Sequence, residues 1–198
     1  MEYLIIPLAY LLGSVPWALI IGKTFYHTDI RESGSGNLGG TNAGRVLGKK
    51  AGVIVMTLDV LKAVLAVFIG SLFSEQAGAL AGIFCTIGHC FPLFAGFRGG
   101  KAVSTSAGFL FALVVFLKFS YLILVIPVAV FFLVLYIGKM VSLASITAAV
   151  VAMLTALFLP VDWIIKTTIV VLAVLIVYRH RANIQRIRDK TENKITWM

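Results

Sequence analysis

Long apolar stretches dominate this sequence and leave few folds open to it. Seven of them follow one another along the chain, at residues 3–22, 53–73, 78–96, 103–117, 119–138, 142–160 and 163–179. Of the 198 residues, 60% are hydrophobic and 13% are charged, which is about half the charged fraction of a typical soluble domain. Because a helix needs roughly 20 apolar residues to cross a bilayer, the chain has room for about seven spans. The sequence therefore predicts an all-α integral membrane protein, a bundle of seven transmembrane helices in a single domain over residues 1–198.

The basic residues are distributed unevenly over the connections between these segments. Most of the 17 Lys and Arg residues follow the first, third, fifth and seventh segments, at Lys23, Arg31, Arg45, Lys49, Lys50, Arg98, Lys101, Lys139, Arg179, Arg181, Arg186, Arg188, Lys190 and Lys194. If the helices alternate in direction, all of these lie on one side of the membrane, and the positive-inside rule makes that side the cytoplasm. We therefore expect the N-terminus outside, the C-terminus in the cytoplasm, and the active site facing the cytoplasm.

Several other classes of protein are disfavoured. The net charge of +9 is spread between apolar stretches rather than over one broad face, so we expect no nucleic-acid partner. The start Met1-Glu2-Tyr3 lacks the basic region of a signal peptide, which favours a retained first helix. Cys85 and Cys90 form neither a disulfide framework nor a zinc motif.

A glycine-rich run at residues 33–45, SGSGNLGGTNAGR, follows the first apolar segment. It nearly matches the phosphate-binding loop of nucleotide hydrolases, but Gly40 stands where the lysine is required and no strand precedes it. Glycines still allow N–H groups, hydroxyls and amides to converge on an anion, with an arginine supplying charge. The candidate anion-binding residues are Ser35, Gly36, Asn37, Gly39, Thr41, Asn42 and Arg45. The alternative is a flexible connector, which has no need for an arginine at this position.

A second run, GHCFPLFAGFRGGK at residues 88–101, closes the third apolar segment and opens the fourth. Gly99 and Gly100 free the backbone just before a predicted helix N-terminus, which attracts phosphate. Lys101 adds a positive charge and Ser104 a hydroxyl. The alternative is a tight turn with a topology-determining lysine. We interpret His89 as structural rather than catalytic.

Polar residues also occur inside or at the ends of other apolar segments. Asp59 and Lys62 are three residues apart on one helix face, and an ionisable pair within a span is either functional or a mutually neutralised structural contact. Ser142 opens the sixth segment in a group of small residues. His180 and Asn183 are neighbours at the end of the seventh, where Arg179, Arg181 and Arg186 can contact phosphate or lipid headgroups.

Five stretches together carry a resemblance to a known family. GSGNLGGTNAGR, the Asp59 and Lys62 pair, GHCFPLFAGFRGGKAVSTSAG, KMVSLASIT and YRHRANIQRIR occur in the same order as in the bacterial membrane acyl-phosphate:glycerol-3-phosphate acyltransferases, the PlsY family. Some positions depart from that pattern: Leu38 and Gly40 replace Pro and Ala, Ala63 replaces Gly, and Ala102 and Ser104 replace Gly and Ala. None of these changes removes a hydrogen-bond donor or a charge.

The resemblance implies a seven-helix bundle in the bacterial cytoplasmic membrane that makes lysophosphatidic acid from acyl phosphate and glycerol 3-phosphate. Matched by motif position, the implied functional residues are Ser35, Arg45, Lys101, Ser142, His180 and Asn183. We expect Lys62 and Arg181, with the glycines, amides and hydroxyls of both glycine-rich runs, to contribute to substrate binding. The expected partners are the two substrates and membrane lipid, with no cofactor, no metal and no obligate protein partner.

The residues agree with this chemistry, because both substrates carry a phosphate and the chain supplies two glycine-rich anion sites. We expect a substrate phosphate oxygen to accept the hydroxyl proton, with His180 as the alternative base. An HxxxxD acyltransferase dyad is missing, since the nearest match pairs His27 with Glu32. A phosphate or organophosphate transporter is the alternative function, although the polar residues cluster at one face and no half of the chain is duplicated. A magnesium-dependent phosphatidyl-alcohol transferase would need more aspartates on that face.

Overall fold

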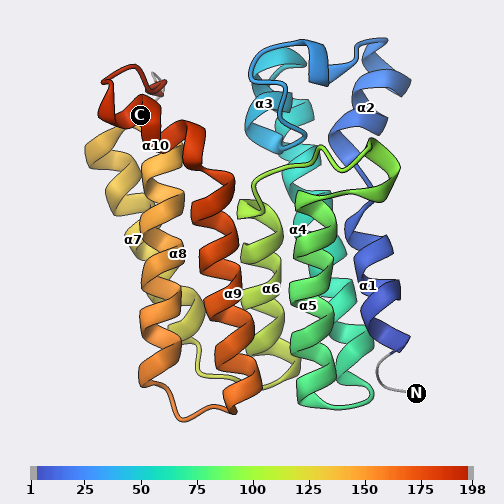
Figure 1. Ribbon diagram of the computed structural model, residues 1–198, viewed down its shortest axis with the longest axis vertical. Coiled ribbons are helices and arrows are strands. Elements are labelled where there is room, and N and C mark those ends of the chain that lie inside the picture. The colour runs from blue at the N-terminus through green and yellow to red at the C-terminus, as the bar shows by residue number, and fades with distance from the viewer. Residues whose placement is uncertain (1–3, 196–198) are drawn as a thin grey trace. The chain divides into compact units, whose positions relative to one another are not determined.

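The structure is a computed structural model that describes residues 4–195, and every regular element in that range is a helix (Figure 1). The chain divides into two compact units, of residues 1–117 and 118–198. Unit 1 contains α1 (Ile5–Gly13), α2 (Trp17–Tyr26), the 3₁₀ helix η2 (Ile30–Glu32), α3 (Gly40–Val46), α4 (Lys49–Ser71), α5 (Glu75–Cys90), the 3₁₀ helix η3 (Leu93–Ala95) and α6 (Val103–Phe116). Unit 2 contains α7 (Leu122–Gly138), α8 (Val141–Phe158), α9 (Trp163–Arg179) and α10 (Arg181–Arg188).

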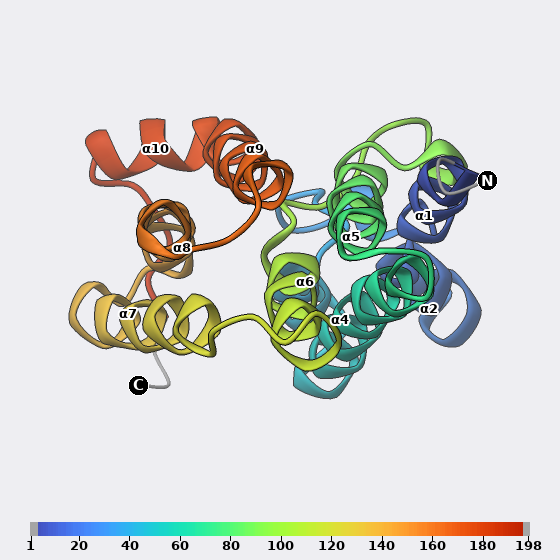
Figure 2. The ribbon, with the colours of Figure 1, turned by 90° about the horizontal axis from the view of Figure 1, so that it is seen from below.

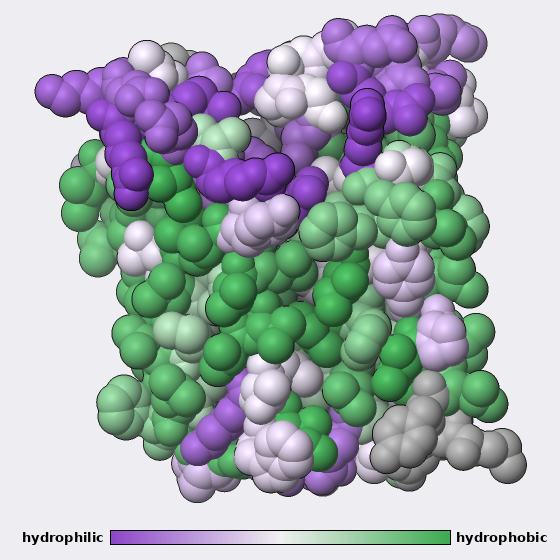
Figure 3. Space-filling model, in the orientation of Figure 1, coloured by the Kyte–Doolittle hydropathy of each residue, from purple (hydrophilic) through white to green (hydrophobic). Residues whose placement is uncertain are grey.

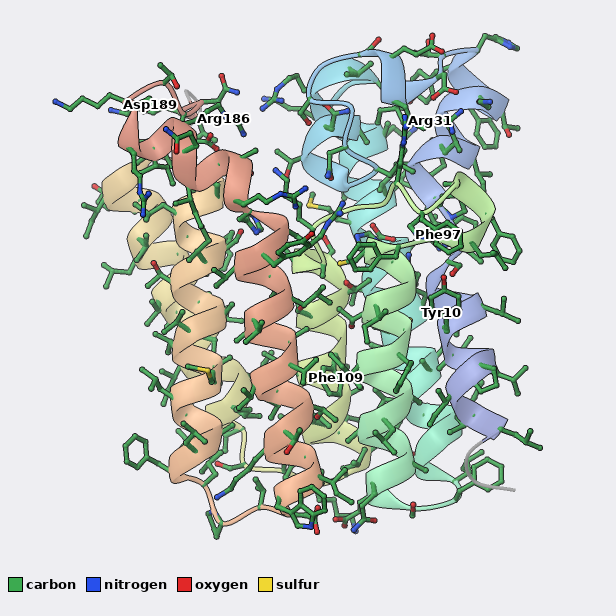
Figure 4. All side chains as sticks on the ribbon, viewed as in Figure 1. Tyr10, Arg31, Phe97, Phe109, Arg186 and Asp189 are labelled. Carbon is green, nitrogen blue, oxygen red and sulfur yellow. The ribbon has the colours of Figure 1, made fainter. Side chains whose placement is uncertain are left out.

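Unit 1 is organised around α4, which packs against both α5 and α6, while α1 lies on α5 (Figure 2). The helices approach closely because glycines face bulky neighbours. Phe109 on α6 is fully buried, and a Cβ atom added to Gly82 on α5 would lie 2.2 Å from its ring (Figure 4). Such contacts between small residues and side chains from adjacent helices give membrane helices their packing energy.

The first apolar segment is two helices rather than one. α1 ends at Gly13 and α2 begins at Trp17, directly after Pro16, which has no N–H group to continue the helical hydrogen bonds. The predicted start of this segment, Tyr3, lies outside the described residues, as does the rest of the Met1-Glu2-Tyr3 start.

In unit 2, α8 packs against both α7 and α9. Lys139 adopts a left-handed conformation, with φ of 56°, and so reverses the chain between α7 and α8. α9 and α10 are separated by a bend of 55° at His180. The tail after α10 returns to the α7–α8 turn, where Ile195 N donates a 2.7 Å hydrogen bond to the Lys139 carbonyl.

Each of the seven predicted apolar segments is helical. By length and composition, four helical stretches of the described chain can cross a membrane: Ile5–Tyr26, Lys49–Ser71, Glu75–Ala95 and Val141–Phe158. The bent pair of α9 and α10 makes a fifth if it counts as one span, and α6 and α7 are shorter apolar helices. On each unit, apolar side chains cover the flanks, and hydrophilic ones gather on the α2 to α3 end of unit 1 and around α10 of unit 2 (Figure 3).

Candidate functional site

The first glycine-rich segment, residues 33–45, is an ordered turn followed by a short helix rather than an open loop. The Asn42 side chain holds the turn together. Its Oδ1 accepts a hydrogen bond from Ser35 N (2.9 Å), and its Nδ2 donates to the carbonyls of Ser33 (3.2 Å) and Ile30 (3.3 Å). Asn42 is 2% exposed, and its amide takes the place of water as the hydrogen-bond partner of three backbone groups. The Asn42 side chain therefore fixes the conformation of the turn that contains Ser35.

The second half of this segment forms α3, which lies directly on α4. A Cβ atom on Gly40 would lie 2.2 Å from Met56 Cγ, and one on Gly52 would lie 2.6 Å from Gly44 Cα. Only glycine permits two helices to approach this closely. The close packing places Thr41 and Arg45 on the exposed side of α3, where both can meet a ligand.

The second glycine-rich segment, residues 88–101, folds back on the end of α5. Gly100 N donates a hydrogen bond to the His89 carbonyl (3.1 Å), and a Cβ atom on Gly99 would lie 2.1 Å from that same oxygen. Asn37 Nδ2 in the first segment donates to the Gly99 carbonyl at 3.4 Å. The two glycine-rich segments predicted to bind anions therefore lie side by side in unit 1.

Lys101 and Ser104 flank the start of α6. Ala102 is the N-cap residue of this helix and has a left-handed conformation, with φ of 66°. An alanine has no side-chain atom that could accept hydrogen bonds from the first N–H groups of α6. Anion binding at the start of α6 stays a prediction.

Beneath the second segment lies a buried cluster of Asp59, Lys62 and His89. Lys62 Nζ lies 2.8 Å from Asp59 Oδ1 and 3.0 Å from His89 Nδ1, and it donates a hydrogen bond to the Val15 carbonyl (3.2 Å). His89 Nδ1 is itself 3.3 Å from Asp59 Oδ1. The side chains of Asp59 and Lys62 are 3% and 2% exposed. Lys62 was predicted to bind substrate, but its ammonium is fully engaged inside the unit.

The cluster reaches the glycine-rich segment through the histidine ring. A Cβ atom on Gly100 would lie 2.1 Å from His89 Nε2, so the ring and the glycine backbone are in close contact. Tyr10 Oη on α1 also donates to the Phe91 carbonyl at 2.8 Å, which ties the start of the same segment to a second helix (Figure 4). The buried Asp59 and Lys62 pair thus holds the His89 ring beneath the second segment, and its structural role stays a prediction.

Unit 2 gathers its polar groups around one carboxylate that the sequence analysis did not single out. Glu192 Oε1 accepts hydrogen bonds from Ser142 Oγ (2.7 Å) and Asn183 Nδ2 (2.6 Å), and Oε2 accepts from Arg186 Nε (2.7 Å). Partial burial by itself raises the pKa of Glu192, but these three donors outweigh it and hold the pKa below its usual range. Glu192 is therefore ionised at neutral pH.

The two remaining candidates of unit 2 lie at the bend between α9 and α10. His180 is buried, and its Nδ1 is 2.8 Å from the Ile176 carbonyl. A carbonyl only accepts, so Nδ1 carries the proton and Nε2 is the basic nitrogen of the neutral ring. Arg181 is exposed and lies over the Tyr178 ring, 4.7 Å from its centroid.

The candidates thus form two sets. Unit 1 brings together both glycine-rich segments and, below them, the Asp59, Lys62 and His89 cluster. Unit 2 joins Ser142 to Asn183 through Glu192 and Arg186. The sequence did not indicate Glu192, which is one acid in a basic tail, and it indicated Arg186 only as one of three arginines that can contact phosphate or lipid headgroups.

Comparison with known proteins agrees with the arrangement of these motifs. Residues 3–190 match the sequence model of the glycerol-3-phosphate acyltransferase family. The chain belongs to this family. It is 51% identical over 195 residues to the glycerol-3-phosphate acyltransferase of Listeria welshimeri, which covers 96% of this chain and 95% of that protein. It is 50% identical to the Geobacillus kaustophilus acyltransferase, covering 100% of this chain and 98% of that protein.

Two crystal structures of PlsY, an integral membrane glycerol 3-phosphate acyltransferase, are also similar. The form with glycerol 3-phosphate has a TM-score of 0.90 and 34% identity, covering 98% of this chain and 96% of that one. The form with lysophosphatidic acid has a TM-score of 0.87 and 33% identity, covering 98% and 95%. The resemblance inferred from the five sequence stretches is therefore confirmed, and the all-helical fold is that of an integral membrane acyltransferase.

Proposed function

We propose that this protein transfers an acyl group from acyl phosphate to glycerol 3-phosphate, giving lysophosphatidic acid and inorganic phosphate in the first acylation of phospholipid synthesis. The observation that carries the proposal is the Asn37 to Gly99 hydrogen bond, which joins the two glycine-rich segments. Each segment ends in a basic residue, Arg45 or Lys101. Two anion sites side by side match a reaction in which both substrates carry phosphate.

The residues of unit 1 have distinct proposed roles. Arg45 and Lys101 neutralise substrate phosphates, while backbone N–H groups and the hydroxyls of Ser35, Thr41 and Ser104 orient them. Asn42 and Lys62 act indirectly, because their polar atoms are engaged in holding the turn of residues 33–35 and the His89 ring. Gly36, Gly39, Gly99 and Gly100 give the ligand access to the backbone.

The chemistry needs alignment more than a strong base. Acyl phosphate is a mixed anhydride, so the acceptor hydroxyl attacks the carbonyl carbon, a C–O ester bond forms, and the C–O bond to phosphate breaks as phosphate leaves with the electron pair. A substrate phosphate oxygen takes the hydroxyl proton. His180 is the alternative base, since its Nε2 has a lone pair in the neutral ring. His180→Gln should keep substantial activity if phosphate is the acceptor, and a variant that binds both substrates without turnover would assign the proton to His180.

We also propose the topology that the charge pattern predicts, in which the seven apolar segments cross the bacterial cytoplasmic membrane as one domain. The N-terminus then lies outside, and the C-terminus and active site lie in the cytoplasm. An impermeant label should reach the N-terminus of intact cells, and a C-terminal reporter should be cytoplasmic. Finding both ends on one side would exclude an odd number of crossings.

The direct test of the activity uses purified protein in detergent with palmitoyl phosphate, labelled glycerol 3-phosphate and a metal chelator. We expect stoichiometric lysophosphatidic acid and inorganic phosphate, with no nucleotide added. A matched preparation of Lys101→Ala serves as the negative control. Absence of product from the wild-type protein, or a strict magnesium requirement, would contradict the proposal.

A further inference from the structure

Unit 2 carries its tyrosine and tryptophan side chains only at the ends of two helices. The described part of this unit, residues 118–195, contains four of them, and each is more than half exposed. Tyr121 and Trp163 stand at the starts of α7 and α9, and Tyr136 and Tyr178 stand near their ends. Tyr and Trp concentrate at the two interfaces between a membrane and water. The four rings therefore mark two interfacial levels on unit 2.

The distance between these two levels is the same on both helices. α8 connects α7 to α9, so both helices run toward the end of the unit that carries α10 (Figure 1). Tyr136 follows Tyr121 by 15 positions, and Tyr178 follows Trp163 by 15 positions. At a helical rise of about 1.5 Å per residue, this spacing is about 22 Å along each helix. The hydrocarbon core of a typical bilayer is about 30 Å thick, so the rings are about 8 Å too close together for it.

Two basic side chains are held at the level of the tyrosines near α10. Lys139 Nζ lies 4.7 Å from the centroid of the Tyr136 ring, and Arg181 Cζ lies 4.7 Å from the centroid of the Tyr178 ring. A cation over the face of an aromatic ring is attracted to it electrostatically. Each charge therefore stays at the depth of its ring, and neither side chain extends away from the helix end to lengthen the span.

The opposite level is polar as well. Lys166, three positions after Trp163, donates a hydrogen bond to the Leu157 carbonyl at the end of α8 (3.3 Å). Lys118 lies exposed just before α7. Between the two levels, residues 122–135 of α7 contain no polar side chain. The boundary between polar and apolar side chains therefore coincides with the aromatic rings at both ends of α7.

A helix that is too short for a bilayer is not matched to it by tilting, because tilt reduces the thickness that the helix spans. Either the bilayer thins beside the helix, or the polar groups at the helix ends enter hydrocarbon. Thinning costs only a small free energy per ångström, whereas a charged side chain within hydrocarbon is expensive. The charges at both ends of α7 and α9 therefore favour thinning. α8 has 18 residues and can tilt to fit the same layer.

We propose that unit 2 fits a hydrocarbon layer of about 22 Å, thins the bilayer around α7 and α9, and prefers phospholipids with short acyl chains as its lipid partners. The inference rests on the proposed topology, in which both helices cross the membrane. It goes beyond the proposed reaction, since it concerns the lipid that surrounds the enzyme rather than either substrate. It also accounts for the short length of α7 and of α9, which have 17 residues each.

The experiment reconstitutes the purified protein in vesicles of a series of phosphatidylcholines with dimyristoleoyl, dipalmitoleoyl, dioleoyl, dieicosenoyl or dierucoyl chains. These lipids share a headgroup and the same degree of unsaturation, so they differ chiefly in bilayer thickness. Thermal unfolding should give the highest Tm in dimyristoleoyl or dipalmitoleoyl vesicles. The Tm should be lower by roughly 5 °C or more in dierucoyl vesicles, because each ångström of mismatch adds to the cost. A Tm that is highest in dioleoyl or thicker bilayers would contradict the proposal.

A variant with longer apolar stretches tests whether unit 2 sets this lipid preference. It replaces the polar level at the starts of α7 and α9 with leucines, through Lys118→Leu, Tyr121→Leu, Trp163→Leu and Lys166→Leu. We expect the lipid that gives the highest Tm to move at least one step toward longer chains. The matched control keeps this level polar and aromatic, through Lys118→Arg, Tyr121→Trp, Trp163→Tyr and Lys166→Arg, and should keep the wild-type preference. The same preference in both variants would exclude unit 2 as its cause.

If the leucine variant does not fold, spin labels measure the depth of the two levels directly. A nitroxide is attached to Tyr121→Cys or to Tyr136→Cys, since the native Cys85 and Cys90 are buried. In dioleoyl vesicles, the relative accessibility of the nitroxide to oxygen and to a water-soluble nickel complex reports its depth. Both labels should lie at the headgroup level. A label within the hydrocarbon at either position would show that the bilayer does not thin.

A failure of the proposed topology is recognised by a separate measurement. An impermeant maleimide should label Lys118→Cys and Arg181→Cys from opposite sides of the membrane, because α7, α8 and α9 lie between these positions. Labelling from the same side would refute the topology on which the inference rests. Labelling from opposite sides without the expected lipid preference would refute the thinning alone. Acyl transfer in detergent remains an independent test of the reaction.

Discussion

The polar regions of the two units are built from different groups. In unit 1 the ligand-facing elements are mostly backbone, brought together by glycines whose added Cβ atoms would collide with His89, Met56 or a neighbouring glycine. In unit 2 they are side chains from α8, α10 and the tail, joined through a single carboxylate. Unit 1 contains backbone N–H groups and positive charge next to glycines, whereas the cluster of unit 2 is organised around the negative charge of Glu192.

The difference shows two ways of holding polar groups in place. Backbone N–H groups beside glycine suit a phosphate, which needs several donors at short range. A buried carboxylate instead fixes the side chains that donate hydrogen bonds to it. The ion pairs of the two units differ as well. Lys62 of unit 1 neutralises Asp59 deep within the helices, whereas Arg186 of unit 2 pairs with Glu192 at a helix end.

The largest expected effect concerns the buried ion pair that supports unit 1. Lys62→Met leaves Asp59 as an uncompensated charge among the helices and should lower the free energy of unfolding by about 3–5 kcal/mol. Adding Asp59→Asn should recover much of that loss, because the isolated charge is gone. Thermal unfolding in detergent measures both, with exposed Lys50→Met as control. An equally stable Lys62→Met protein would mean that unit 1 does not depend on the pair.

The next effect concerns Arg45 and Lys101, the charges that we propose bind substrate phosphates. Arg45→Ala or Lys101→Ala should lose roughly 2–4 kcal/mol of transition-state stabilisation, seen in kcat/KM, while the folded protein persists. Lys50→Ala, which removes an exposed charge near the same glycine-rich segment, should keep wild-type kinetics. Near-wild-type turnover by Lys101→Ala would remove that residue from phosphate binding.

The glycine-rich segments of unit 1 make close backbone contacts, so we expect a single added methyl group to disturb their packing. The new Cβ atom in Gly100→Ala would lie 2.1 Å from His89 Nε2, so ring and segment must separate at a cost of about 1–3 kcal/mol. Gly44→Ala is the matched control, since its Cβ atom would meet Gly52 Cα at an ordinary 3.7 Å. If both variants behave alike in stability and kcat, the close contact of Gly100 has no role.

The smallest effect has the opposite sign. Ala102 holds a left-handed conformation, with φ of 66°, at a position where the family pattern has glycine. Ala102→Gly relieves the strain of the left-handed conformation but loses more backbone entropy on folding. The net effect should be a rise in the free energy of unfolding of about 0.5–1 kcal/mol. Ala107→Gly, at an exposed position of the same helix, should lower it by about 0.5–1 kcal/mol. The same sign for both variants would contradict the strain at Ala102.

Much of unit 1 could be predicted from the sequence because its signals are local. Apolar runs located the helices, and glycines next to Arg45 and Lys101 indicated the anion sites. The sequence analysis missed the helix break before Trp17 because the apolar run continues through Pro16. It missed α3 because glycine and asparagine disfavour isolated helices. Packing of Gly40 and Gly44 on α4 overrides that preference.

The cluster around Glu192 in unit 2 could be predicted only in part. Ser142 and Asn183 were found by their resemblance to family motifs, but their common partner lies 50 and 9 residues away along the chain. No local spacing relates Glu192 to either residue, and an acid in a basic tail usually pairs with solvent. Only the return of the tail to the α7–α8 turn, where Ile195 meets Lys139, brings the carboxylate to its donors.

The measurement that tests the central claim most directly is the choice of acyl donor. We propose that glycine backbone, Arg45 and Lys101 bind the phosphate of an acyl phosphate, whose acyl chain enters from the bilayer, where each buried CH₂ contributes about 0.8 kcal/mol. Purified protein should therefore acylate glycerol 3-phosphate efficiently from palmitoyl phosphate, without added metal or nucleotide, and little or not at all from palmitoyl-CoA. Comparable rates from the two donors would contradict the account.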